Sequence, residues 1–118
     1  MSKGAKSLFG FGIYVVLLGI TLVLVPNVLL TLFAVPATQE VWIRVLGMMI
    51  LFVGYYYIQA ARKELRDFFQ WTVHTRGLVI LFFIAFVLLK LAKPALILFG
   101  AVDLLGALWT AVALRSSR

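Results

Sequence analysis

The chain has one densely charged stretch, Ala61-Arg62-Lys63-Glu64-Leu65-Arg66-Asp67-Phe68-Phe69-Gln70-Trp71, near the middle of its 118 residues. Two long apolar blocks precede this stretch and two follow it. An apolar segment of about 20 residues is long enough to cross a bilayer as a helix. The pattern therefore predicts an aqueous loop that joins two helical hairpins, each of which crosses a membrane twice.

The composition also indicates a membrane protein. Hydrophobic residues make up 64% of the chain and charged residues 13%, and the mean hydropathy is +1.12. A water-soluble domain of this length needs more polar surface than that. We therefore predict an all-α integral membrane four-helix bundle, a single domain over residues 1–118. The expected spans are about 8–25, 41–61, 72–92 and 95–114.

The boundaries of these spans follow from local signals. The basic flank of the first span resembles that of a signal peptide, but the apolar run from Leu8 to Val25 exceeds the usual ~7–15 residues, so we expect a retained helix. Pro26 ends it, and residues 28–35 are too short to cross. Thr38 is the expected N-cap of the second span. The third span should begin near residues 70–72, which places Arg76 in the head-group zone.

The distribution of basic residues predicts the orientation. With four spans, both termini and the central loop share one side of the membrane. That side holds eight basic residues, namely Lys3, Lys6, Arg62, Lys63, Arg66, Arg76, Arg115 and Arg118. The other side holds three, Arg44, Lys90 and Lys93. Because cytoplasmic loops are enriched in Lys and Arg, we expect a multi-pass protein of the inner (plasma) membrane with both termini cytoplasmic. We assign the net charge of +7 to contact with membrane lipid rather than to nucleic acid.

Asp103 is the sharpest candidate for a functional residue, because it lies well inside the fourth span. A charge near the bilayer centre costs about 2.5–3.5 kcal/mol on insertion scales, so it should face the protein interior and have a partner. Arg44 is the preferred partner and Lys90 the alternative. Three roles remain open: an ion pair that holds the helices together, a proton- or cation-binding carboxylate, or a contact with another subunit.

Small residues mark the expected helix contacts, since they let helix backbones approach closely in lipid. The predicted packing residues are Gly47, Gly54, Gly100, Gly106 and Ala107.

The remaining polar residues point to no catalytic or metal chemistry. His74 has no metal-ligand spacing to another His or acid. Glu64 and Asp67 are expected to form a solvated, salt-bridged extension of the second helix. The basic residues Arg44, Lys90 and Lys93 are interpreted as snorkelling side chains rather than an anion site. The chain has no cysteine and no nucleotide or protease motif, so we predict no enzyme, no metal and no cofactor.

The layout resembles small bacterial four-span proteins of the DoxX-like kind. The matching features are Pro26, Trp42 through Gly47, Gly54, Tyr57, Ala60-Ala61, and Gly100-Ala101-Val102-Asp103-Leu104-Leu105-Gly106-Ala107 in the last helix. The resemblance implies a membrane partner of redox or respiratory proteins, although the absence of cysteine argues against a thiol-redox role for this chain itself.

Three functional hypotheses follow. The leading one is an accessory or structural subunit that associates with itself or with a larger membrane complex. The alternative is an oligomeric small-solute or ion transporter or channel that uses Asp103. The third is a lipid- or quinone-binding module that uses an aromatic inner end, made of Tyr55, Tyr56, Tyr57, Trp71 and Trp109.

Overall fold

The computed structural model describes residues 1–32 and 36–116, and every regular element in these residues is a helix. The helices are α1 (Lys3–Leu24), α2 (Pro26–Leu32), α3 (Trp42–Arg62), α4 (Arg66–Leu88) and α5 (Leu96–Ser116). By length and composition, α1, α3, α4 and α5 could each cross a membrane. The prediction of an all-α chain with four span-length helices is therefore confirmed.

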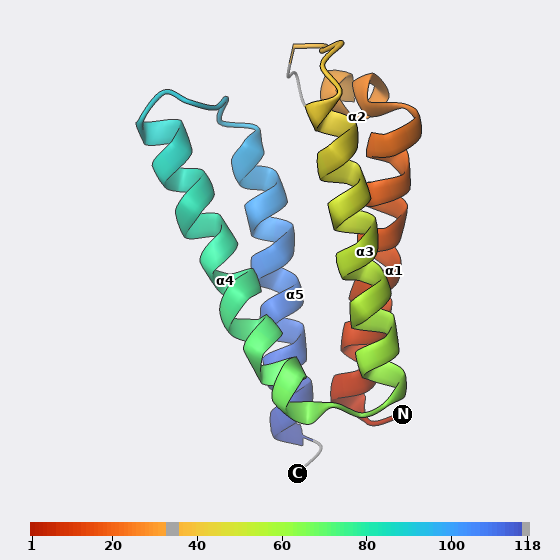
Figure 1. Ribbon diagram of the computed structural model, residues 1–118. Helices are drawn as coiled ribbons and strands as arrows, with labels where there is room; N and C mark the ends of the chain where they lie inside the picture. Colours follow the sequence, from red (N-terminus) through yellow and green to blue (C-terminus); the bar gives the residue numbers. More distant parts are fainter. Residues whose placement is uncertain (33–35, 117–118) are drawn as a thin grey trace.

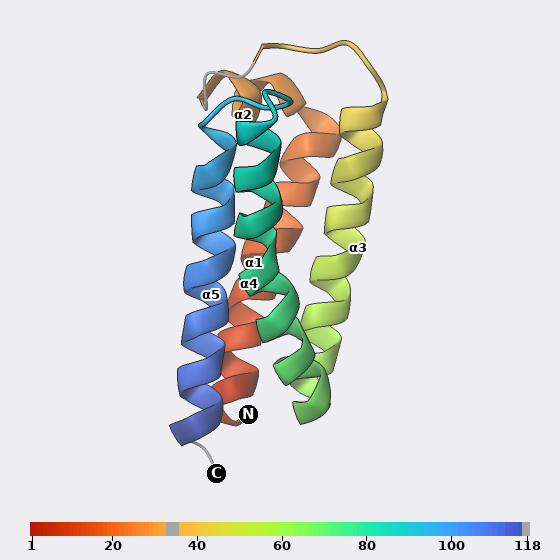
Figure 2. The same ribbon diagram turned by 90° about the vertical axis from the view of Figure 1, so that its left-hand side faces the viewer.

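The four long helices are arranged as two antiparallel pairs, α1 with α3 and α4 with α5 (Figure 1). The pairs contact each other chiefly through α1 and α5. Both termini and the α3–α4 connection lie at one end, which we call the terminal end. The short helix α2 lies across the opposite end (Figure 2), toward which the two pairs diverge in Figure 1.

Two pairs of facing glycines hold α1 against α3. A Cβ atom added at Gly54 would lie 3.0 Å from the carbonyl oxygen of Gly12, and one at Gly47 would lie 2.9 Å from that of Gly19. Gly12 and Gly19 are seven residues apart in α1, as are Gly47 and Gly54 in α3, so the glycines recur on one face of each helix. The predicted packing residues Gly47 and Gly54 thus lie where two backbones approach closely.

The small residues of α5 lie at contacts with two other helices. A Cβ at Gly100 would come within 2.9 Å of the Cα of Ile80 in α4, and one at Gly106 would overlap the ring of Phe11 in α1. Ala107 is 2% exposed. Helix α5 is therefore in close contact with both neighbours at these positions.

The central charged stretch differs from its prediction. Only Lys63–Leu65 separate α3 from α4, so α4 begins at Arg66 instead of near residues 70–72. Glu64 has a left-handed backbone with φ of 55°, and its carboxylate accepts hydrogen bonds from the Ser2 backbone N–H and hydroxyl, both at 2.7 Å. These two bonds lower the pKa of Glu64. The predicted extension of the second helix by Glu64 and Asp67 is wrong, because Glu64 binds the N-terminus and Asp67 belongs to the first turn of α4.

The segment before α3 is attached to α2 by one side chain. The amide of Asn27 accepts from the backbone N–H of Thr38 at 2.9 Å and donates to its carbonyl oxygen at 3.1 Å. Thr38 is therefore not the N-cap of α3, which is Val41. Its hydroxyl instead accepts from the backbone N–H of Glu40 at 3.1 Å.

Candidate functional site

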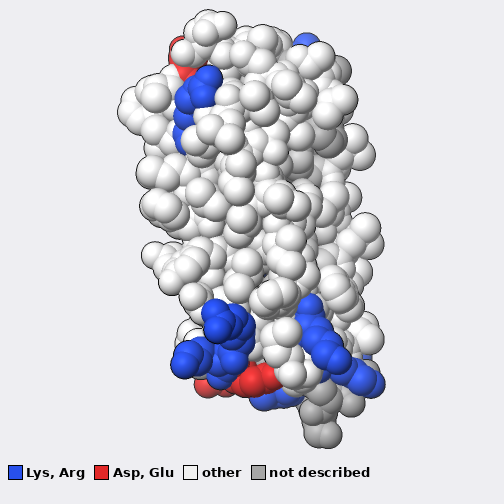
Figure 3. Space-filling model, turned by 90° about the vertical axis from the view of Figure 1, so that its right-hand side faces the viewer, with Lys and Arg blue, Asp and Glu red and all other residues white. Residues whose placement is uncertain are grey.

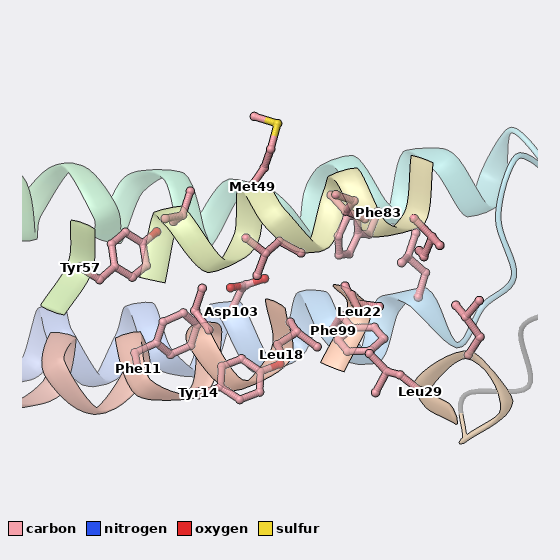
Figure 4. Close-up of a pocket in the computed structure, with 17 residues that line it drawn as sticks. Phe11, Tyr14, Leu18, Leu22, Leu29, Met49, Tyr57, Phe83, Phe99 and Asp103 are labelled. Carbon is pink, nitrogen blue, oxygen red and sulfur yellow. The ribbon is translucent and has the colours of Figure 1, made fainter. Parts of the chain in front are cut away.

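A cavity of about 390 Å³ lies between the two helix pairs (Figure 4). Its lining is almost entirely apolar and draws on all five helices. Among the described residues that line it, Asp103 carries the only formal charge, and Tyr14 and Tyr57 contribute the only hydroxyl groups. The other lining residues are Phe11, Val15, Leu18, Leu22, Leu29, Leu30, Ile43, Leu46, Met49, Ile50, Val53, Phe83, Leu96 and Phe99.

Asp103 projects from α5 into the space between the pairs. Its side chain is half-buried. In Figure 4, Tyr14 and Leu18 lie beside it on α1, while Phe11 and Tyr57 lie on its side toward the terminal end. Phe83, Phe99, Leu22 and Leu29 line the cavity on the side toward α2. The carboxylate therefore faces an apolar, partly aromatic space, where hydrogen bonds and charge pairs are stronger than in water.

Arg76 of α4 is buried and contacts each of the other three long helices. Its side chain is 2% exposed. It donates from Nε to the carbonyl oxygen of Thr72 at 3.2 Å, and from Nη2 to the hydroxyl of Thr110 in α5 at 2.8 Å. The guanidinium carbon lies 4.7 Å from the ring centre of Phe11 and 5.9 Å from that of Tyr57. Arg76 thus connects α4 to α1, α3 and α5.

A buried hydroxyl pair extends this network. Ser7 in α1 donates to the hydroxyl of Thr110 at 2.9 Å, and both residues are fully buried. Gly106 leaves room for the guanidinium, because a Cβ there would lie 3.2 Å from Nη1 of Arg76. Among the described residues, Nη1 is the one buried side-chain polar atom without a hydrogen-bond partner.

Arg76 is a buried residue in the body of α4, whereas the prediction had placed it close to the start of the third span. Because α4 begins at Arg66, Arg76 is almost three helical turns inside the helix. The sequence contains one indication that the Arg76 side chain has a partner. Thr72 precedes Arg76 by four residues, and helical residues at that spacing share a face, so the two side chains can form a hydrogen bond.

Neither Arg44 nor Lys90, the predicted partners, is the cation that acts most on Asp103. Arg76 interacts electrostatically with Asp103. Arg44 is exposed and donates from Nη1 to the carbonyl oxygens of Val23 and Leu24, the latter at 3.4 Å. Helix α1 ends before Pro26, so these carbonyls lack partners within the helix and accept from Arg44. Lys90 is exposed in the α4–α5 connection with φ of 63°. Neither Arg44 nor Lys90 lines the cavity.

Surface charges gather at the terminal end. On the face shown in Figure 3, Lys and Arg side chains cluster at that end together with acidic ones, a few charges lie at the opposite end, and the middle is uncharged.

No family model, no curated protein and no solved structure matches this chain. The functional interpretation therefore rests on the geometry of the cavity and of the residues around it.

Proposed function

We propose that this protein is an inner-membrane protein, with both termini cytoplasmic, that binds a lipophilic amine in the cavity between its two helix pairs. The cavity around Asp103 is the observation that carries the proposal. Its volume of about 390 Å³ falls within the range of small-molecule pockets, roughly 300–1,000 Å³. Such pockets are mostly apolar and contain a few polar groups that orient the ligand, as Asp103, Tyr14 and Tyr57 would do here.

The lining residues favour a head group that donates hydrogen bonds. A carboxylate in a poorly solvated site is unfavourable without a partner, and an ammonium group supplies both charge and donors. The ring of Tyr14, which lies beside Asp103, would add cation–π attraction. Arg76 offsets part of the negative charge of Asp103. The hydrogen bond from the ammonium group to Asp103 and its contact with the aromatic ring would therefore contribute to binding alongside the charge attraction. The same carboxylate repels an anionic head group.

The apolar remainder of the cavity would hold the body of the ligand. It extends from Asp103 past Leu22, Phe83 and Phe99 to Leu29 of α2 (Figure 4). Its lining is apolar, so it matches a ligand body that partitions into lipid. This assignment places the ligand beside Asp103, whereas the sequence-based hypothesis of a lipid or quinone site placed it at the aromatic inner end.

Binding measurements with three matched ligands test the proposal. The purified protein in detergent is titrated with a long-chain alkylamine, with the alcohol of the same chain and with the corresponding carboxylic acid. We expect the amine to bind most tightly and the carboxylate most weakly. Asp103→Asn should weaken amine binding about 10- to 100-fold, since a hydrogen bond to a charged group contributes about 1.5–3 kcal/mol.

The matched control is Asp67→Asn, which removes an acid of the same type from the exposed first turn of α4. This variant should bind the amine as the unchanged protein does. Equal binding of the three ligands, or equal losses in the two variants, would show that Asp103 does not recognise the head group.

A further inference from the structure

The cavity around Asp103 is open on one side, between α3 and α4. The two helix pairs contact each other chiefly through α1 and α5, so the cavity is closed on that side. Among the described residues that line it, those that are exposed all belong to α3: Leu46, Met49 and Val53 are 49%, 58% and 39% exposed. Their spacing of three and four residues places them on one face of α3. In a membrane, this side of the cavity would face lipid.

A separate groove adjoins this opening. It lies between α3 and α4 toward the terminal end and has a volume of about 300 Å³. Its lining residues are Val53, Tyr56, Tyr57, Phe68, Trp71, Thr72 and Thr75. Val53 and Tyr57 line both the groove and the cavity, so these two side chains form a wall between them.

The ring of Tyr57 is the movable part of this wall. Its centre lies 6.1 Å from that of Phe68 in α4, in an edge-to-face arrangement, and 6.3 Å from that of Phe11 in α1. Contacts of this kind break when one side chain rotates, and such rotation is far faster than the movement of a helix. A change in the Tyr57 side chain would therefore join the groove to the cavity and leave the helices in place.

The direction of the cavity matches that of an amphiphile in the leaflet at the terminal end. Asp103 lies nearer the terminal end than Leu22 and Leu29 do, and the apolar part of the cavity extends from it toward α2 (Figure 4). An alkylamine in that leaflet holds its ammonium group at the terminal end and its chain toward the bilayer centre. It would therefore reach Asp103 without turning over, whereas an amine from the other leaflet would arrive with the opposite orientation.

The groove offers the ammonium group a contact before it reaches the carboxylate. Tyr56 and Trp71 are exposed aromatic residues on opposite sides of the groove, and aromatic rings attract ammonium groups. We propose that the ligand of the larger cavity enters from the membrane leaflet at the terminal end, through the groove between α3 and α4 and past Tyr57. This route rests on the proposed function, because it is defined for a lipophilic amine that binds at Asp103.

A removable link across the groove tests the route. The chain has no cysteine, so Tyr56→Cys/Thr75→Cys places the only two thiols on opposite sides of the groove, at exposed residues that do not line the cavity. A short bis-methanethiosulfonate joins them, and a reductant removes it. We expect the link to slow both association and dissociation of a long-chain alkylamine at least about tenfold and to leave Kd unchanged, because a blocked route hinders passage in both directions.

The matched control links α4 to α5 instead. Val73→Cys/Ala111→Cys joins two residues that line a groove on another side of the molecule and do not line the cavity. This link should leave both rates unchanged. Mass spectrometry distinguishes a link within one chain from a link between two copies. A link between copies across Tyr56 and Thr75 would overturn the route, because a second copy would then cover the groove.

A second variant tests the wall itself. Phe68→Ala removes the ring against which Tyr57 packs, at a residue outside the cavity, and should raise both rates about 2- to 12-fold, the factor that corresponds to one edge-to-face pair. Phe82→Ala, at an exposed residue of α4 that lines neither the groove nor the cavity, should change neither rate. Rates that ignore both the link and Phe68→Ala would contradict the route alone. Failure of the unlinked protein to bind the amine would contradict the proposed function and the route together.

Discussion

Arg76 has the most connected side chain around the candidate site. It donates to Thr72 and Thr110 and lies over the rings of Phe11 and Tyr57. A buried guanidinium is costly unless its donors are satisfied, and here one nitrogen, Nη1, has no partner among the described residues. Arg76 of α4 thus contacts three other helices, α1, α3 and α5, while its Nη1 atom has no hydrogen-bond partner.

Replacement of Arg76 tests whether this network stabilises the fold. We expect Arg76→Met, which keeps the length and removes the charge, to lower stability by about 2 kcal/mol, because hydrogen bonds from a charged donor contribute about 1.5–3 kcal/mol. Thermal unfolding in detergent measures the change. Arg62→Met, at an exposed residue of α3, is the control and should change stability by less than about 0.5 kcal/mol.

An increase in stability in Arg76→Met would contradict this role. Well-packed apolar replacements of buried charges are sometimes stabilising. In that case Arg76 would serve the chemistry of the site near Asp103 rather than the packing of the helices.

At the scale of the elements, glycine contacts determine how closely α1 and α3 approach. The same residue type has opposite roles at different positions. A Cβ at Gly54 would lie 2.7 Å from Cγ2 of Val16 and 2.8 Å from its backbone nitrogen, whereas one at Gly77 of α4 would meet nothing within 4 Å. Glycine at position 54 therefore permits a contact, while at position 77 it only lowers helix propensity.

The two glycines form a matched pair of variants. Gly54→Ala should lower stability by about 1–3 kcal/mol, because backbone atoms of α1 must move to admit the methyl group. Gly77→Ala should raise stability by up to about 1 kcal/mol through helix propensity. Thermal unfolding of both proteins in the same detergent checks the two signs. A neutral or stabilising Gly54→Ala would mean that α1 and α3 do not pack as closely as described.

At the scale of the whole molecule, the helix pairs join at the terminal end and leave the larger cavity between them. Arg76, Thr110 and Ser7 lie at the junction. Four span-length helices around an interior of this size suit a binding module. They are equally suited to a subunit of a larger assembly, and the accessory role and the DoxX-like resemblance stay predictions from the sequence.

The mass of the native assembly tests the accessory role. The protein is extracted gently from its own membrane and studied by native mass spectrometry. If it is an accessory subunit, we expect 13.2 kDa chains bound to larger, different subunits. Assemblies of this chain alone would contradict that role and favour self-association, and the Asp103→Asn comparison would then be made on the homo-oligomer.

The amino-acid sequence alone determined the helical class, the four span-length segments and the positions of the small residues. Apolar block length and glycine spacing are local properties, so they can be read without knowledge of the fold. It also indicated Asp103, because an acidic residue inside an apolar segment can be recognised from the sequence even when its partner is unknown. The prediction from the sequence placed the start of α4 too late. The short turn before Arg66 contains Glu64, which accepts two hydrogen bonds from Ser2, and no local pattern reveals this contact because the two residues are 62 positions apart.

Only the tertiary structure decided which basic residue is buried between the helices and where the cavity lies. Arg44 and Lys90 were reasonable partners by depth along their helices, but the rotation and tilt of each helix determine which side chains meet. Arg44 instead binds the carbonyls at the end of α1, and Arg76 lies inside the protein. The physical reason is that burial of a charge depends on donors and acceptors from several helices at once, here Thr72 and Thr110, which no local pattern specifies.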